Sequence, residues 1–447
     1  MIISEQQVEL ISPNPAAFKT GKALSARDKW QTMAKSDRAI WGEIKGSGKN
    51  PYQAQVDLSS LAFKCSCPSR QFPCKHNIGL MLLYVSSPNE FTLTSEEPDW
   101  VKAWLDKRQT KVSKPETVER TANEQEKRDK AKGKTQEDRF NSVKAGAAEL
   151  ELWLKDLIRI GILELPNKPA SDFTRIAARM VDAKAPGLAN WVKLLGSLDF
   201  SSSTEWQSEA LTIISKLFLL ISTFNNYDNL SPIWQTTVKN LVGWNQSPKE
   251  LIASSDAETI SDKWLVVGQI VETTDNDIIT QKNYLVGCES NRSALILNFI
   301  TKYSTIENPI LPGSIVNAEL AFFPSALPLR AAIKESHSVD SLLEQQPSAL
   351  ISWKEAFNNQ TEQQRINPWL AETFVIVDDL RLTKSDSQWL AYDNEMHYVP
   401  VAPQLDLQKI MKWLVISGNR KMQVACILKN EVIIPLGLFE NNQYITL

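Results

Sequence analysis

The stretch FKCSCPSRQFPCKHNIGLMLLY, residues 63–84, holds three of the chain's five cysteines and one of its three histidines. The spacing is Cys65-x-Cys67, six residues, then Cys74-x-His76. Thiolate sulfur and imidazole nitrogen are preferred ligands of zinc, and four of them complete a tetrahedron. The sequence therefore predicts a Zn²⁺ site at these four residues. It is expected to be structural, because a catalytic zinc keeps one position open for water or substrate.

The residues around this stretch predict two strands and a helix. Apolar and polar residues alternate in Tyr52–Leu58, which is the period of a half-buried strand, and Ile40–Lys45 is a second short strand. Glycine and proline between them, in residues 46–51, are typical of a hairpin turn. The apolar run Asn77–Val85 is expected to be a helix packed on this hairpin, and Ala23–Met33 upstream is also expected to be helical.

The ligand types, their order, the short spacers and the flanking ββα pattern resemble the SWIM-type zinc finger, over about residues 40–85. The surrounding KGSGKNPYQAQVDLSS and CPSRQFPCKH are similar to a bacterial branch of that family. The resemblance implies a module for contact with nucleic acid or protein. Members of the branch are often encoded beside MoxR-type AAA+ ATPases and von Willebrand A-domain proteins. The resemblance therefore also implies a MoxR-type AAA+ ATPase or a von Willebrand A-domain protein as the partner.

The rest of the chain divides by composition, and the whole predicts a multidomain α+β protein, since 447 residues exceed one ordinary core. Residues 1–105 form the zinc-finger domain. Residues 106–144 are polar and of mixed charge, which predicts a charged flexible linker. Apolar residues at helical spacing predict a helical domain at 145–260. Segments rich in β-branched and aromatic residues predict a β-rich domain at 261–338 and a mixed α/β domain at 339–447.

Within the β-rich half, residues 262–335 fit a small barrel of the OB kind. Strand number and composition agree with such a barrel, as they do with any antiparallel β domain.

Charge and hydropathy limit the possible partners. The net charge of -3 gives no general attraction to nucleic acid, so such binding needs a local basic patch. Lys64, Arg70 and Lys75 beside the ligands are the predicted contacts with a partner or with nucleic acid, and Phe72 or Tyr52 would offer a stacking face. No apolar run approaches the ~20 residues of a spanning helix, and no signal-peptide pattern begins the chain. A cytoplasmic protein without a membrane partner is expected.

Three functional hypotheses follow. The leading one is a non-enzymatic, zinc-stabilised interaction or adaptor protein that works with an AAA+ chaperone-like partner. The alternative is a DNA- or RNA-binding protein with the finger as the reading surface. The third is an enzyme with its site in the C-terminal half. The sequence has no G-x-S-x-G or H-E-x-x-H motif, so a deep pocket with perturbed titratable groups would be needed to support it.

Overall fold

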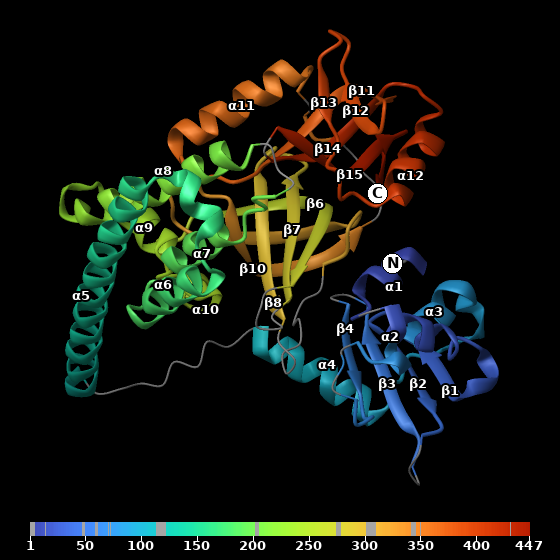
Figure 1. Ribbon diagram of the computed structural model, residues 1–447. Helices are drawn as coiled ribbons and strands as arrows, with labels where there is room; N and C mark the ends of the chain where they lie inside the picture. Colours follow the sequence, from blue (N-terminus) through green and yellow to red (C-terminus); the bar gives the residue numbers. More distant parts are fainter. Residues whose placement is uncertain are drawn as a thin grey trace.

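The structure is a computed structural model of the chain, with four folded parts that follow one another in sequence (Figure 1). It has the mixed α+β architecture that the sequence predicted, with a helical middle and a β-rich C-terminal half. The described residues are 5–13, 15–46, 50–58, 61–69, 71, 73–112, 122–201, 205–273, 279–300, 310–340, 346–348, 350–429 and 431–447. Among the helices of these residues, none combines the length and the apolar character that a membrane span requires.

The N-terminal part is a five-stranded sheet between helices. Its elements are α1 (Glu5–Ile11), α2 (Pro15–Lys22), β1 (Trp30–Lys35), β2 (Ala39–Ile44), β3 (Tyr52–Asp57), β4 (Ala62–Cys65), α3 (Lys75–Ser86), β5 (Thr92–Leu93) and α4 (Asp99–Val112). The strand order is β4-β3-β2-β1-β5. Because side chains alternate along β2, Ile40 packs in the core with Ile78 of α3, and Trp41 packs on the other side with Val101 of α4.

The predicted hairpin and helix are confirmed as β2, β3 and α3. The helix predicted at Ala23–Met33 is wrong, because α2 ends at Lys22 and β1 begins at Trp30. Trp30 and Met33 are buried, and β1 pairs antiparallel with β2. Their spacing of three residues is typical of a helix, but a register shift between Trp30 and Thr32 in the pairing with β2 lets both side chains of the strand reach the same core.

Much of the segment predicted as a flexible linker, 106–144, is helical. Helix α4 reaches Val112, and α5 (Ala122–Ile160) begins before the expected end of the linker; residues 113–121 lie outside the described ones. The C-terminal part of α5 buries Leu150 and Leu154 in the next core. A helix anchored there extends upstream at low cost, since each added residue gains a backbone hydrogen bond after nucleation. Polar composition alone does not reveal such an extension.

The helical part is a bundle around one apolar core. Its elements are α5, α6 (Ala170–Asp182), α7 (Pro186–Gly196), α8 (Trp206–Asn225) and α9 (Pro232–Leu241). The short helix α10 (Pro248–Ile252) follows and packs through Leu251 on Ala321 and Ala332 of the next part. Phe173, Val192 and Leu217 are among the buried residues of that core. Helix α7 begins against the end of α9: a Cβ on Gly187 would lie 2.0 Å from the carbonyl oxygen of Leu241. Only glycine permits this approach.

The next part is a closed five-stranded barrel. Its strands are β6 (Thr259–Thr273), β7 (Ile279–Gly287), β8 (Ser293–Ile300), β9 (Ile315–Phe322) and β10 (Arg330–Asp340). The order is β10-β8-β7-β6-β9, and β9 closes the barrel on β10. Strands β8 and β10 pair in parallel, while the other pairs are antiparallel. This topology confirms a small barrel of the OB kind, with Trp264, Leu285 and Leu320 in its interior.

The C-terminal part is a six-stranded sheet that packs on the outside of the barrel. Its elements are α11 (Trp353–Ile366), β11 (Thr373–Ser385), β12 (Gln388–Tyr392), β13 (Tyr398–Pro400), α12 (Leu407–Ser417), β14 (Met422–Lys429), β15 (Val432–Glu440) and β16 (Gln443–Thr446). The order is β13-β12-β11-β14-β15-β16. Val267 and Val286 of the barrel share a buried cluster with Ala425 and Leu436 of this sheet. The hydroxyl of Tyr284 donates to Glu372 at 2.5 Å across the same boundary.

One tryptophan joins the C-terminal part to the helical bundle. Trp369, between α11 and β11, is 6% exposed and belongs to the bundle's core cluster. Its indole Nε1–H donates to the carbonyl oxygen of Lys216 on α8 at 2.8 Å. Its ring also meets that of Trp234 on α9, with the centroids 6.3 Å apart.

We expect Trp369→Ala to destabilise the bundle by about 3 to 5 kcal/mol, because it leaves a large cavity in the core. Trp369→Phe keeps most of the ring but loses the hydrogen bond, and is expected to cost about 1 to 2 kcal/mol. Thermal melts and limited proteolysis of both variants measure the difference. Equal melting temperatures for Trp369→Ala and the parent chain would contradict this role.

Candidate metal centre

The first two predicted ligands lie where β4 ends. Cys65 is the last residue of β4 and pairs with Ala54 of β3. Ser66 continues the pairing: its N–H donates to the carbonyl oxygen of Gln53 at 3.0 Å, and its Oγ accepts from the Gln53 N–H at 2.9 Å. In an extended chain, side chains two residues apart point to the same side. Cys65 and Cys67 therefore converge.

The other two ligands lie at the beginning of α3. Cys74 is the N-cap residue, and His76 is in the first turn. The Ile78 N–H donates to the Cys74 carbonyl oxygen at 3.0 Å, which is the first bond of the helix. Both ligands are buried, with Cys74 1% and His76 6% exposed. The apolar face of α3 holds this end of the helix against the sheet, so it brings both side chains to the end of β4.

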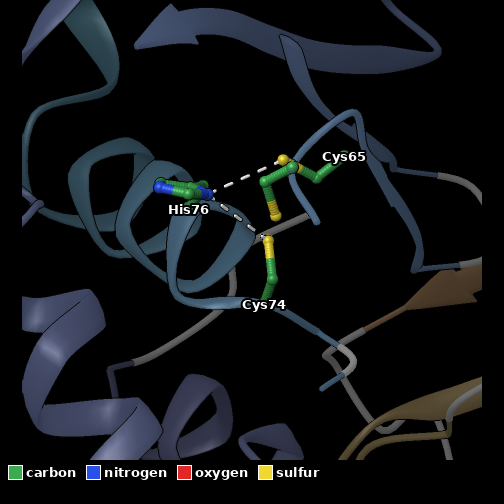
Figure 2. A group of neighbouring side chains, drawn as sticks. Cys65, Cys74 and His76 are labelled. Atoms are coloured by element: carbon green, nitrogen blue, oxygen red, sulfur yellow. Dashed lines mark hydrogen bonds between the residues drawn. The ribbon is translucent and has the colours of Figure 1, made fainter. Parts of the chain in front are cut away.

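The structure brings all four predicted ligands together. Their ligand atoms lie within 4.8 Å of one another. Nδ1 of His76 lies 3.8 Å from Sγ of Cys65 and 3.9 Å from Sγ of Cys74 (Figure 2). Bonds of about 2.3 Å to sulfur and 2.0 Å to nitrogen in a tetrahedron separate S from N by about 3.5 Å. The donor set and its dimensions therefore fit a tetrahedral metal ion.

Hydrogen bonds among the three thiols shift their pKa values in different directions. A hydrogen bond with Cys67 raises the pKa of the Cys65 thiol, and hydrogen bonds with Cys65 and Cys74 lower the pKa of Cys67. For Cys74, a hydrogen bond with Cys65 lowers the pKa, but the bond with Cys67 and burial outweigh it and raise the pKa to about 11. A cation that binds all three sulfurs has to displace the protons that the thiols carry.

Asn77 holds the ligands in place through hydrogen bonds to the two neighbouring strands. The sequence analysis did not predict this role. The residue is fully buried. Its Nδ2 donates to the carbonyl oxygen of Gln55 on β3 at 3.2 Å and to that of Lys64 on β4 at 3.1 Å. Its Oδ1 lies 3.1 Å from Sγ of Cys74. One amide thus ties α3 to both strands and touches a ligand. The available signal was a polar residue at the start of the run 77–85, directly after His76.

The structure places the residues predicted to contact a partner or nucleic acid in different surroundings. Lys64 and Lys75 are exposed beside the cluster. Arg70 and Phe72 lie outside the described residues. Tyr52, the other expected stacking residue, packs on the site: its ring centroid is 5.2 Å from that of His76. Tyr52 therefore covers a ligand within the domain.

The comparison with protein families matches one part of the chain. Residues 138–242 match the model of the SWIM-associated four-helix bundle domain. This range covers the C-terminal part of α5 and helices α6 to α9. No curated protein and no solved structure is significantly similar to the chain. Fold and site define a multidomain protein that combines a Cys/His cluster suited to a metal ion with a helical bundle that matches the SWIM-associated domain model over residues 138–242.

We expect Asn77→Ala to lower metal affinity about 10- to 100-fold, because the residue holds the strands that orient the ligands. A Zn²⁺ titration against a chromophoric chelator measures the change. Asn89→Ala is the matched control, since Asn89 is exposed just beyond the end of α3 and is expected to have no effect. Equal affinity in Asn77→Ala and the parent chain would show that Asn77 does not position the ligands.

Proposed function

We propose that the chain is a non-enzymatic, zinc-binding interaction protein whose N-terminal SWIM-type finger presents a surface to a protein partner. The observation that carries this proposal is the four-ligand cluster in one chain with a SWIM-associated bundle. Four protein ligands fill a tetrahedron, so no position remains for substrate or water, and the ion serves as a structural clamp.

The donor set favours zinc as the ion. Three thiolates and one imidazole are soft and borderline ligands, which suit Zn²⁺ better than Mg²⁺ or Ca²⁺. Three thiolates and Zn²⁺ leave a net charge of -1 on the centre. The exposed ammonium groups of Lys64 and Lys75 beside it offset that charge.

Two observations favour protein over nucleic acid as the partner. Tyr52 packs on His76, so its ring is not a free platform for a base. OB barrels bind oligonucleotides on the outer face of their second and third strands. In this chain the C-terminal sheet covers part of that face on β6 and β7, with Tyr284 and Val286 of β7 buried in the shared cluster, while Phe299 of β8 stays exposed.

The resemblance to the bacterial SWIM branch supports a particular class of partner. A MoxR-type AAA+ ATPase or a von Willebrand A-domain protein in the cytoplasm is the partner we propose. Nucleic-acid binding by the finger is the second candidate, and the exposed Lys64 and Lys75 are the observation in its favour.

The metal is tested first. We expect one zinc per chain by elemental analysis of protein purified without chelators, and Cys74→Ser should sharply reduce it, because the variant loses one ligand. Since the site and the local fold form together, the same variant should unfold the finger, which shows as faster hydrogen exchange in α3. The buried but isolated Cys426 gives the control: Cys426→Ser should leave the zinc content unchanged.

The partner is tested by co-purification with a MoxR-type ATPase and, separately, with a von Willebrand A-domain protein. We expect the zinc-loaded chain to retain at least one of them and Cys74→Ser to lose it. Lys64→Glu/Lys75→Glu should weaken retention, because these side chains lie on the proposed contact surface. Lys102→Glu is the matched control, exposed on α4 at the opposite side of the sheet.

Two results would overturn the leading function. One is that the zinc-loaded chain retains neither protein. The other is salt-sensitive binding of a single-stranded oligonucleotide that Lys64→Glu/Lys75→Glu abolishes while protein contacts are absent, which would establish the nucleic-acid reader instead.

A further inference from the structure

Two cations and two aromatic rings form a separate cluster on the helical bundle. Arg139 of α5 and Lys239 of α9 both lie over the ring of Trp244, at 4.8 Å and 5.0 Å from its centroid. Lys239 Nζ is also 5.0 Å from the ring of Tyr227. All four side chains are half-buried, so the cluster lies at the surface of the bundle.

The end of α9 fixes Trp244 in place. Gly243 has φ of +100°, a conformation that residues with a Cβ avoid. The Trp244 N–H then donates to the carbonyl oxygen of Lys239 at 2.8 Å, as in a Schellman motif. This turn folds the indole back over its own helix. Arg139 adds a bond from Nη2 to the carbonyl oxygen of Gly243 at 3.2 Å, so the guanidinium is held at the same turn.

Tyr227 is held just as firmly. It lies in a short 3-10 helix, Tyr227–Asn229, between α8 and α9. The ring of Phe140 packs edge-on against it, with the centroids 5.1 Å apart. Nε2 of Gln235 donates to its carbonyl oxygen at 3.2 Å. The cluster is therefore preorganised and does not depend on a ligand for its shape.

The two positive charges of the cluster are not balanced by the residues that the structure describes. In that part of the chain no carboxylate forms an ion pair with Arg139 or Lys239, although the exposed Asp138 and Asp228 are near in sequence. Other arginines of the bundle are paired, such as Arg175 with Asp172 at 3.0 Å. Two like charges on one ring repel, and a bound anion would offset that repulsion.

We propose that Arg139 and Lys239, held on Trp244 and Tyr227, form a second interaction surface that binds carboxylates of an acidic segment in a partner protein. The guanidinium makes one hydrogen bond with described residues, so it keeps donors for a carboxylate. Acidic protein is favoured over nucleic acid because the rings are occupied by the two cations and by Phe140. Stacking of bases needs a free aromatic face.

The proposal of this second surface rests on the proposed function in one respect, which is that the chain is an interaction protein. Its residues lie on α5, α9 and the adjoining turns, whereas the finger lies in the N-terminal part. Each surface can therefore fail without the other, and Cys74→Ser separates the two.

The test measures binding of a fluorescein-labelled peptide of alternating Glu and Ser to the zinc-loaded full chain, by fluorescence polarisation. We expect Arg139→Gln/Lys239→Gln to weaken binding about tenfold and to flatten its salt dependence, since two charge contacts are lost. Arg159→Gln/Lys249→Gln is the matched control and should change affinity less than about twofold. Arg159 lies on the same helix α5 and is paired with Asp156 at 3.0 Å, and Lys249 is exposed on α10.

Two further variants complete the design. Lys239→Gln alone leaves the bond from Arg139 to Gly243 intact, so it tests the surface even if the double variant melts early. Cys74→Ser should retain peptide binding, which separates this surface from the finger. The proposal is overturned if the parent chain does not bind the peptide, or if Arg139→Gln/Lys239→Gln and Lys239→Gln bind it as the parent does. It is also overturned if oligothymidine binds more tightly than the peptide through the same two residues.

Discussion

Closure of the barrel β6 to β10 is the constraint on which the arrangement of the other parts depends. Because β9 pairs with both β6 and β10, the barrel offers no free strand edge, and neighbours can attach only through side chains and loops. The C-terminal sheet buries Val267 and Val286 on the outer face of the barrel. The bundle joins through the β9–β10 connection, where the Ala326 N–H donates to Oγ1 of Thr237 at 2.7 Å. The N-terminal part joins through Leu311, which lies in that part's core.

This arrangement places the two proposed surfaces on different parts of the chain. The Cys/His cluster lies at one side of the N-terminal sheet, with Lys64 and Lys75 exposed beside it. The cluster of Arg139, Lys239, Trp244 and Tyr227 lies on the bundle. Both are built on rigid elements, a helix N-terminus against a strand end in one case and a helix C-terminus with its Schellman turn in the other. If both proposed surfaces engage one partner, the second contact forms at high effective concentration.

The cluster of Cys65, Cys67, Cys74 and His76 could be predicted from the sequence. The hydrogen bonds of Asn77 that hold the cluster in place could not. Four ligands within residues 65–76 need only local geometry, an extended C-x-C and a helix start, and local geometry follows from sequence. Asn77 acts through the carbonyl oxygens of Gln55 on β3 and Lys64 on β4, which are 22 and 13 residues away from it in the chain. The same limit explains the wrong helix at Ala23–Met33, because Trp30 and Met33 have a helical spacing and only the irregular pairing with β2 buries both of them in a strand.

The sequence by itself determined the Cys/His cluster, the hairpin and helix that carry it, the helical middle and the β-rich end, because each depends on residue type and local period. Only the tertiary structure decided which of these parts pack on one another and through which residues. Trp369 belongs by sequence to the C-terminal half, yet it lies in the core of the bundle. Arg139 and Trp244 are more than a hundred residues apart in the chain, yet their side chains stack. Contacts between distant segments depend on how separately folded parts pack, and no local pattern encodes that packing.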